Sequence, residues 1–344
     1  MTTQTRLSAF KILKGVARIS LMEPDGKTRF PAEFCLLMAR EKINLLFLTC
    51  GNQEGGWGLN VAVDSGDAKK VLALIEKKFG KAFLNTAESG ILSLFPHRSD
   101  PSVTGSLFQV LDMTGIEPDA LAYSNSAISV VLRKEAIETT TSALFEPFQF
   151  SAYRTPADWK LAQKGKEQLF KEVVASYQEK KPKVYNLEWQ EGQNLFRVEL
   201  KNRDMGPMGD TFISFAQKGF LLPFLTSTPS IEQQELNLYL CIPDYDQKKH
   251  PHLFKETLPD AVTTRVAPVA VFSMNGPHFG DRYGIASELL KAFDNAGVEL
   301  LALGCAIASI SGIVRADQIE TATNAIQECF EVPSVIRKSR SKVN

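Results

Sequence analysis

The loop at residues 275–284 gathers the side chains of this chain that are best suited to hold a small charged molecule. It reads Asn-Gly-Pro-His-Phe-Gly-Asp-Arg-Tyr-Gly and leads from an apolar run, 269–274, into a helical pattern. A helix N-terminus attracts a carboxylate through its free N–H groups and its positive dipole end. Glycines let the backbone approach a ligand closely. We expect contributions from Asn275, Gly276, His278, Gly280, Asp281, Arg282, Gly284 and Ile285.

An amino acid would suit this loop, because it needs both a carboxylate site and an acceptor for its ammonium group. Asp281 or Asn275 could accept hydrogen bonds from the ammonium, whereas Arg282 could pair with an acidic side chain of the ligand. The structural alternative is that Asp281 serves as a turn or cap residue. A second loop, 96–102, also precedes a helical pattern, and Asp100 is a ligand candidate there with the same alternative.

Motifs that would indicate catalysis are missing from the sequence. It contains no GxxxxGK[ST] or GxGxxG phosphate motif and no nucleophile elbow. The four histidines are scattered, and a metal site at His250 and His252 would need further ligands. We therefore expect no catalytic residues, no metal and no cofactor. A triad that converges only in space stays open, so an enzyme with a site between the halves is the least favoured alternative.

Composition excludes several classes of partner. Lysine plus arginine and aspartate plus glutamate each number 39, so no net field attracts nucleic acid or an acidic membrane surface. No apolar run approaches the roughly 18 residues of a membrane span. The five cysteines form no CxxC pair, and the start of the chain shows no apolar signal segment. These features predict a cytoplasmic location.

The sequence is a long duplication. Residues 127–148 match 309–330 at a shift of 182, including Ile137-Glu138-Thr139 against Ile319-Glu320-Thr321. At a shift of 177, LLFLTC at 45–50 matches LPFLTS at 222–227. The halves cover roughly 10–150 and 183–335. The charged stretch between them reads as a connecting helix that is docked on the protein.

Each half divides again. In the last quarter a strand, a helix, two strands and a helix follow one another, and Gly297 stands where a left-handed helix cap belongs. This order is that of the ferredoxin-like split βαβ unit. The predicted fold class is α+β, with four ferredoxin-like βαββαβ units arranged as two tandem pairs. The predicted ranges are 10–85, 88–155, 183–260 and 265–335 for the units, and 156–182 for the connecting helix.

The amino-acid sequence of the second and fourth units resembles the ACT domain, and in particular the paired regulatory ACT domains of aspartokinases. Gly284-Ile285-Ala286, Ala296-Gly297-Val298 and Ser309-Ile310-Ser311 carry the likeness in the fourth unit. The first and third units lack a clean helix start of this type, and Lys42 stands where the turn glycine is usual. The aspartokinase catalytic domain is not implied, because Lys78-Phe79-Gly80-Lys81 follows a helical pattern instead of a strand.

The resemblance implies that an effector sits between two units, against the second strand of a facing unit. Candidate walls are then Gly304 and Cys305 in the fourth unit and, in the second, Tyr123, Ser124 and Asn125. We expect a non-catalytic regulatory protein that binds a small molecule, most simply an amino acid. A homodimer is expected, and a metabolic enzyme is a further candidate partner. The alternative is an interaction scaffold or regulatory subunit that has lost its ligand.

Overall fold

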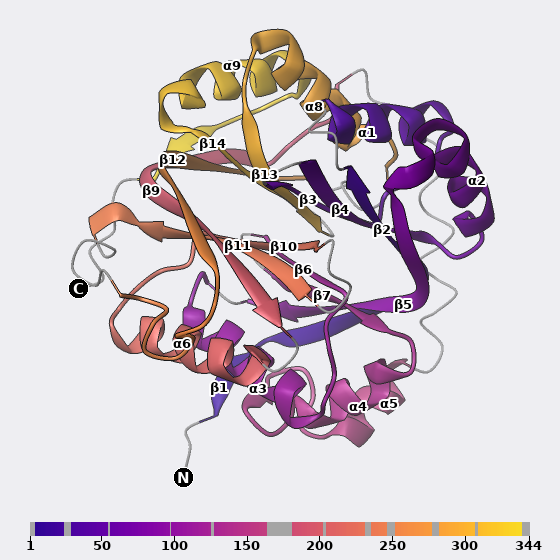
Figure 1. The fold of residues 1–344 in the computed structure, drawn as a ribbon. Helices are drawn as coiled ribbons and strands as arrows, with labels where there is room; N and C mark the ends of the chain where they lie inside the picture. Colours follow the sequence, from indigo (N-terminus) through magenta and orange to yellow (C-terminus); the bar gives the residue numbers. More distant parts are fainter. Residues whose placement is uncertain are drawn as a thin grey trace.

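The computed structural model describes residues 4–23, 29–53, 56–96, 98–124, 127–163, 181–201, 204–230, 235–245, 252–276, 282–306 and 309–338. The fold is mixed α+β, as the sequence predicts. One large sheet runs through the molecule, and helices cover it on two opposite sides (Figure 1).

The order strand, helix, strand, strand occurs four times, and we call these runs blocks 1 to 4. Block 1 is β2 (Ala9–Glu23), α1 (Phe30–Arg40), β3 (Phe47–Gln53) and β4 (Gly56–Asp64). Block 2 is β5 (Phe83–Phe95), α3 (Pro101–Met113), β6 (Ala120–Tyr123) and β7 (Ile128–Arg133). Block 3 is β9 (Asn186–Lys201), α6 (Met205–Gln217), β10 (Phe224–Pro229) and β11 (Glu235–Pro243). Block 4 is β12 (Thr263–Asn275), α8 (Ile285–Ala296), β13 (Leu300–Ala306) and β14 (Ser309–Arg315).

The remaining elements follow blocks 1, 2 and 4 or begin the chain. They are β1 (Thr5–Leu7), α2 (Ala68–Phe79), α4 (Ala136–Ala143), β8 (Phe148–Phe150), α5 (Pro156–Gln163), α9 (Ile319–Cys329) and β15 (Val335–Arg337), with short 3₁₀ turns at Gly80–Ala82 and Ala316–Gln318. Strands β1 and β8 pair in parallel as a separate two-stranded sheet.

The large sheet closes on itself. Its strand order is β11-β10-β6-β7-β5-β2-β4-β3-β13-β14-β12-β9-β15, and β9 also pairs with β11. Blocks 1 and 4 therefore meet through β3 and β13, which pair over five residues, Phe47↔Ala306 to Gly51↔Ala302. Blocks 2 and 3 meet through β6 and β10, which share one register pair, Ala122↔Thr226. We call these contacts the β3–β13 junction and the β6–β10 junction.

The closed sheet has an outer face under the helices and an inner face where opposite parts of the sheet meet. Helices α1, α2, α8 and α9 lie on one side of the molecule, and α3, α4 and α6 on the other (Figure 1). One apolar core fills the space beneath each helix group. Strand β4 is covered on both faces, and eight of its nine residues are therefore buried.

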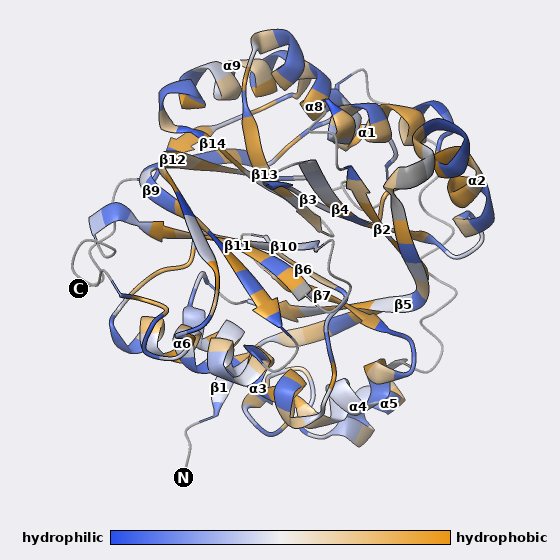
Figure 2. Cartoon of the chain, viewed as in Figure 1, coloured by the Kyte–Doolittle hydropathy of each residue, from blue (hydrophilic) through white to orange (hydrophobic). Residues whose placement is uncertain are grey.

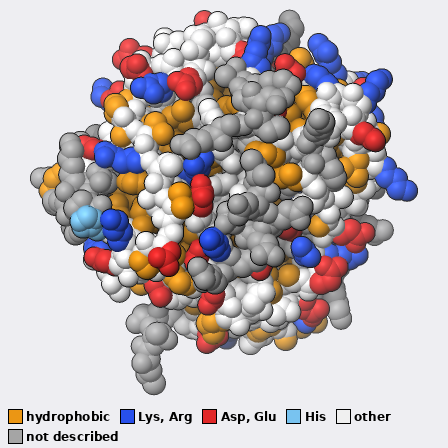
Figure 3. All heavy atoms as spheres, viewed as in Figure 1, with side chains coloured by type: hydrophobic (Ala, Val, Ile, Leu, Met, Phe, Trp, Pro, Cys, Tyr) orange, Lys and Arg blue, Asp and Glu red, His pale blue; other side chains and the backbone are white. Residues whose placement is uncertain are grey.

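The helices obey the apolar spacing read from the sequence. In α8, Ile285, Leu289 and Phe293 are all buried against the sheet, while polar residues face outwards, a pattern also visible on α2 and α9 (Figure 2). No helix in the described part of the chain combines the length and the apolar character that a bilayer crossing requires. On the face drawn in Figure 3, acidic and basic side chains are interspersed.

The helix of every block is followed by a residue in the left-handed conformation. These residues are Lys42 (φ 57°), Gly115 (φ 62°), Gly219 (φ 74°) and Gly297 (φ 67°). Block 1 therefore keeps the turn geometry although lysine replaces glycine. After β11, residues 252–257 and 259–260 form turns. The predicted connecting helix begins with α5, and its residues 164–180 lie outside the described part.

The inner face is tight because small residues face large ones across it. A Cβ atom placed on Gly51 of β3 would lie 2.6 Å from Cζ of Tyr239, which reaches over from β11. The Tyr239 hydroxyl donates to the Asn52 carbonyl at 2.9 Å. A Cβ on Gly304 would meet Ala122 and Thr226 at 3.4 Å. Close approach of the two halves thus depends on glycine at the β3–β13 junction.

Candidate functional site

A pocket lies over the β3–β13 junction, between helices α1 and α8. Its cavity volume is about 20 Å³, so a ligand larger than a water molecule would need the walls from α1 and α8 to move apart. Its apolar wall comes from α1, β3 and the turn between them, and from the end of β13 and the start of β14. The residues of this wall are Cys35, Met38, Ala39, Ile43, Leu45, Leu46, Leu48, Cys305, Ala306 and Ile310. The site therefore belongs to two blocks that are distant in sequence.

The polar end of the pocket is the N-terminus of α8. Gly284 is the N-cap, takes a left-handed conformation (φ 89°) and supplies no side-chain cap. Ile285, Ala286 and Ser287 form the first turn and line the pocket. The N–H groups of a first helical turn have no partner within the helix, and the dipole of this 12-residue helix favours negative charge there. This end of the pocket is suited to a carboxylate.

Two further polar residues line the same pocket. Ser309 begins β14, and its buried hydroxyl oxygen has no hydrogen-bond partner within the described part of the chain. By strand alternation this hydroxyl lies on the same face of β14 as Ser311, opposite to Ile310, so Ser309 lines the pocket without pointing its hydroxyl into it. Arg282 also lines the pocket, and its charge acts on Glu288. Burial raises the pKa of Glu288, and Arg282 partly offsets this effect.

The thiols at the junction do not form a reactive centre. Burial raises the pKa of the Cys35 thiol to about 12. Burial also raises the pKa of Cys50 and of Cys305 well above the usual value; Cys35 adds to the effect on Cys50, and both of these thiols add to the effect on Cys305. Since the thiolate is the nucleophile, the three cysteines act as small apolar residues, and Cys35 and Cys305 form part of the pocket wall. No group of three His, Cys, Asp or Glu residues in the described ranges is placed to hold a metal ion.

The structure brings part of the predicted loop to this pocket. Arg282, Gly284 and Ile285 line it, whereas His278, Gly280 and Asp281 lie outside the described residues. Gly276 is buried just beyond the end of β12. The side-chain amide of Asn275 donates to Asn186 Oδ1 at 3.0 Å, across the β12–β9 pair. Their roles in ligand binding stay predictions.

The candidates of block 2 lie apart from this pocket. Asp100 caps α3, because its Oδ1 accepts from the Ser102 N–H at 2.8 Å. Tyr123 is buried, and its hydroxyl bonds to that of Thr104. The hydroxyl of Ser124 and the backbone of Ala127 bond to each other across a turn. Asn125 lies outside the described residues. Of the two expected walls in block 4, Cys305 lines the pocket and Gly304 faces Ala122 on the inner face.

Sequence reasoning missed the contribution of block 1 to the pocket. Cys35, Met38 and Ala39 sit on α1, which looks like an ordinary apolar helix. Only the pairing of β3 with β13 places this helix opposite α8. The duplicated second strand, LLFLTC, was the available signal, because a unit whose second strand is its sheet edge needs a partner there.

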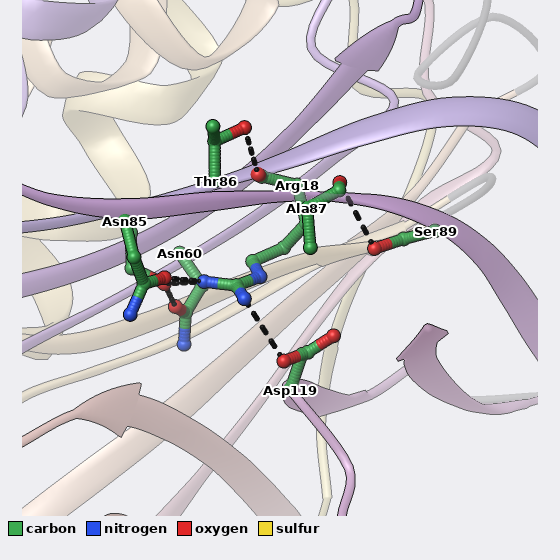
Figure 4. Close-up of polar contacts among 8 residues, drawn as sticks. Arg18, Asn60, Asn85, Thr86, Ala87, Ser89 and Asp119 are labelled. Atoms are coloured by element: carbon green, nitrogen blue, oxygen red, sulfur yellow. Dashed lines mark hydrogen bonds and ion pairs between the residues drawn. The ribbon is translucent and has the colours of Figure 1, made fainter. Parts of the chain in front are cut away.

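A buried polar cluster occupies another part of the molecule, around Arg18 of β2 (Figure 4). Its Nη2 donates to Asp119 Oδ1 at 2.9 Å, and its Nη1 donates to Ser20 at 2.6 Å and to Asn85. Ser20 in turn donates to Asn60 Oδ1 at 2.6 Å. Burial lowers the pKa of Arg18 and raises that of Asp119, and the attraction between the two charges opposes both shifts. The cluster ties β2 to the residue that precedes β6.

Comparison with known proteins bears on the fold. No protein-family model matches the sequence, and no curated protein sequence matches it. Among solved structures, the chain resembles aspartate kinase from Synechocystis with a TM-score of 0.75 and 13% identity, over 98% of this chain and 58% of that chain. At this identity the likeness shows a shared fold. The chain thus spans 58% of the length of the Synechocystis protein.

Two regulatory subunits of aspartate kinase are also similar over part of the chain. The subunit from Thermus flavus shows 13% identity over 43% of this chain and 98% of that chain, with a TM-score of 0.38. The ligand-free subunit from Thermus thermophilus shows 18% identity over 42% of this chain and 99% of that chain, again with a TM-score of 0.38.

Proposed function

We propose that the chain is a non-catalytic regulatory protein built of four ferredoxin-like units of ACT type, and that it binds an amino acid in the α1–α8 pocket. The four blocks would be these units, in two tandem pairs. The fold shared with an aspartate kinase supports a part in amino-acid metabolism, and the resemblance of the sequence to regulatory ACT domains favours control of an enzyme over turnover by this chain.

The observation that carries the proposal is the chemistry of the pocket. One end offers the first turn of α8, which suits a carboxylate. The rest of the wall is apolar and suits a short side chain. A small pocket with an apolar wall and a few convergent polar groups is the usual form of a small-molecule site.

Binding would act on the contact between blocks 1 and 4. A ligand in this pocket touches α1 and β3 on one side and α8, β13 and β14 on the other. It therefore stabilises the arrangement in which both groups of elements contact the ligand, relative to arrangements in which they have moved apart or slid past each other. A ligand shifts such an equilibrium only through its different affinity for the two arrangements. A partner enzyme or a second copy of the chain would read this shift.

The test is a thermal-melt screen of the full chain against the twenty amino acids, one at a time, at millimolar concentration. A ligand present at about 100 times its dissociation constant stabilises the folded protein by about 2.7 kcal/mol. We expect one or a few amino acids to raise the melting temperature. Flat melts across the panel would reject the proposal in favour of the scaffold, and partner proteins would then be sought.

The expected homodimer and cytoplasmic location stay predictions. The single chain already pairs its second strands, at the β3–β13 and β6–β10 junctions, so a dimer would use other surfaces. Light scattering after size exclusion, with and without the amino acid that shifts the melt, would give the mass in both states.

A further inference from the structure

The two junctions are copies of each other, and the copies can be aligned residue by residue. A shift of 182 carries the pair Tyr123↔Ile128 of β6 and β7 onto Cys305↔Ile310 of β13 and β14. A shift of 177 carries the end of α1 onto that of α6, where the bond from the Ile43 N–H to the Met38 carbonyl becomes the bond from Phe220 to Phe215. Equivalent positions around the two junctions are therefore known without ambiguity.

At four of these positions, pocket residues of one junction correspond to aromatic rings in the other. Cys305 corresponds to Tyr123. On the facing block, Cys35, Met38 and Ile43 correspond to Phe212, Phe215 and Phe220. All four rings are at most 3% exposed. Their centroids lie 6.2 Å apart from Phe212 to Phe215 and 5.4 Å apart from Phe215 to Phe220.

The Tyr123 hydroxyl ends at the helix that corresponds to α8. It bonds to the hydroxyl of Thr104 in the first turns of α3, and the position equivalent to Thr104 is Ala286, a wall residue of the pocket. At the β6–β10 junction the side chains of the protein thus fill the space and make the polar contact. At the β3–β13 junction a ligand would take both roles.

The β6–β10 junction is also held by backbone and helix contacts around the position of the pocket. The Leu222 N–H donates to the Ser99 carbonyl at 3.0 Å; the residue that corresponds to Ser99 is Asp281, which lies outside the described residues. Helices α3 and α6 touch through glycines, since a Cβ on Gly105 would lie 2.7 Å from the Gly209 carbonyl oxygen. A side-chain bond from Gln109 Nε2 to Asp210 Oδ1, 2.9 Å, bridges the same helices.

We propose that the chain binds one ligand and not two, because the buried aromatic side chains of Tyr123, Phe212, Phe215 and Phe220 fill the second copy of the site. This inference rests on the proposed function of the α1–α8 pocket. The duplicated protein then has two different junctions. The β6–β10 junction is fixed in a filled state, and only the β3–β13 junction changes its packing with ligand concentration. Ligand binding to one chain therefore follows a single-site saturation curve, with no cooperativity between the two junctions.

The first experiment needs no ligand. Cys305→Tyr copies the ring of Tyr123 into the pocket, and Cys305→Tyr with Ala286→Thr also copies its hydroxyl partner. Both variants should melt within a few degrees of the wild type, because Cys35, Met38 and Ile43 are smaller than the phenylalanines at the corresponding positions of the other junction and leave room for a ring. Cys241→Tyr is the matched control: the same change at a fully buried, fully packed position should lower the melting temperature by about 5 °C or more. If Cys305→Tyr falls as far as this control, the equivalence of the two sites is wrong.

The second experiment counts ligands by isothermal titration calorimetry with each L-amino acid that shifts the wild-type melt. We expect one site per chain, and at least a 100-fold loss of affinity in Cys305→Tyr. Tyr123→Phe should keep both the stoichiometry and the affinity of the wild type. Two sites per chain, or unchanged binding in Cys305→Tyr, would overturn the inference. If no amino acid binds the wild type, the proposed function fails, and the melting temperatures of the two tyrosine variants alone decide whether the second site is a filled copy of the first.

Discussion

Replacing Gly51 by alanine should destabilise the protein, because one methyl group would enter space held by Tyr239. The new Cβ would lie 2.6, 2.8 and 3.0 Å from three ring carbons of Tyr239, against about 3.5–4.0 Å for an ordinary carbon contact. The ring is 2% exposed, and its hydroxyl is bound to the Asn52 carbonyl. It can retreat only by losing this bond and by pushing on the opposite part of the sheet.

The size of the effect follows from two opposing contributions. An extra methyl group in a packed interior costs about 1–3 kcal/mol. Alanine restricts the unfolded chain more than glycine does, which stabilises by about 0.4–1 kcal/mol where the backbone angles allow it, and Gly51 does not have a positive φ. The net expectation for Gly51→Ala is a loss of about 1–2 kcal/mol.

Urea unfolding followed by tryptophan fluorescence measures this free energy. Gly304→Ala is the control, because its Cβ would meet its nearest neighbours at 3.4 Å, and it should change stability by no more than about 0.5 kcal/mol. In a Tyr239→Leu background the Gly51→Ala penalty should vanish, since the clashing ring is gone. A penalty that persists in this background, or an equal penalty in Gly304→Ala, would refute the view that Tyr239 requires glycine at position 51.

Three other changes test separate parts of the structure by the same unfolding measurement. Gly105→Ala should destabilise by about 1 kcal/mol or more, since its Cβ meets backbone of α6 at 2.7 Å, whereas Gly206→Ala meets the flexible carboxylate of Asp112 and should be close to neutral. Lys42→Gly should stabilise by up to about 1 kcal/mol by relieving a left-handed lysine. For Asp119, burial outweighs the attraction of Arg18 and Arg133 and raises its folded pKa, so its contribution to the free energy of unfolding should fall as the pH rises from about 4 through that pKa. The free energy of unfolding of the wild type minus that of Asp119→Asn should therefore fall over this interval, and a difference that rises would contradict the prediction.

Local sequence patterns were sufficient for the elements and their order. The spacing of Ile285, Leu289 and Phe293 predicts the buried face of α8 because helix periodicity alone fixes which residues share a face. Gly297 predicts the left-handed helix end because few other residues adopt that conformation cheaply. The repeat extends this reasoning to weak segments: Lys42 aligns with Gly219, and both take the left-handed turn. The loop before α8 was also recognisable, since a helix start rich in glycine and charge is a local feature.

Which parts of the chain meet was decided only by the tertiary structure. The closure of the sheet depends on the pairing of β3 with β13 and of β6 with β10, contacts between segments about 100 or more residues apart, and edge strands carry no local mark of their partner. For this reason the wall that α1 contributes to the pocket could not be assigned from the pattern of α1. The same holds for Tyr123. The resemblance implied that it forms a wall of an effector site, but the fold buries its side chain and bonds its hydroxyl to Thr104 of α3, whereas the corresponding Cys305 lines the pocket at the other junction. Periodicity tells which side chains share a face, whereas the volume opposite a side chain depends on a distant segment.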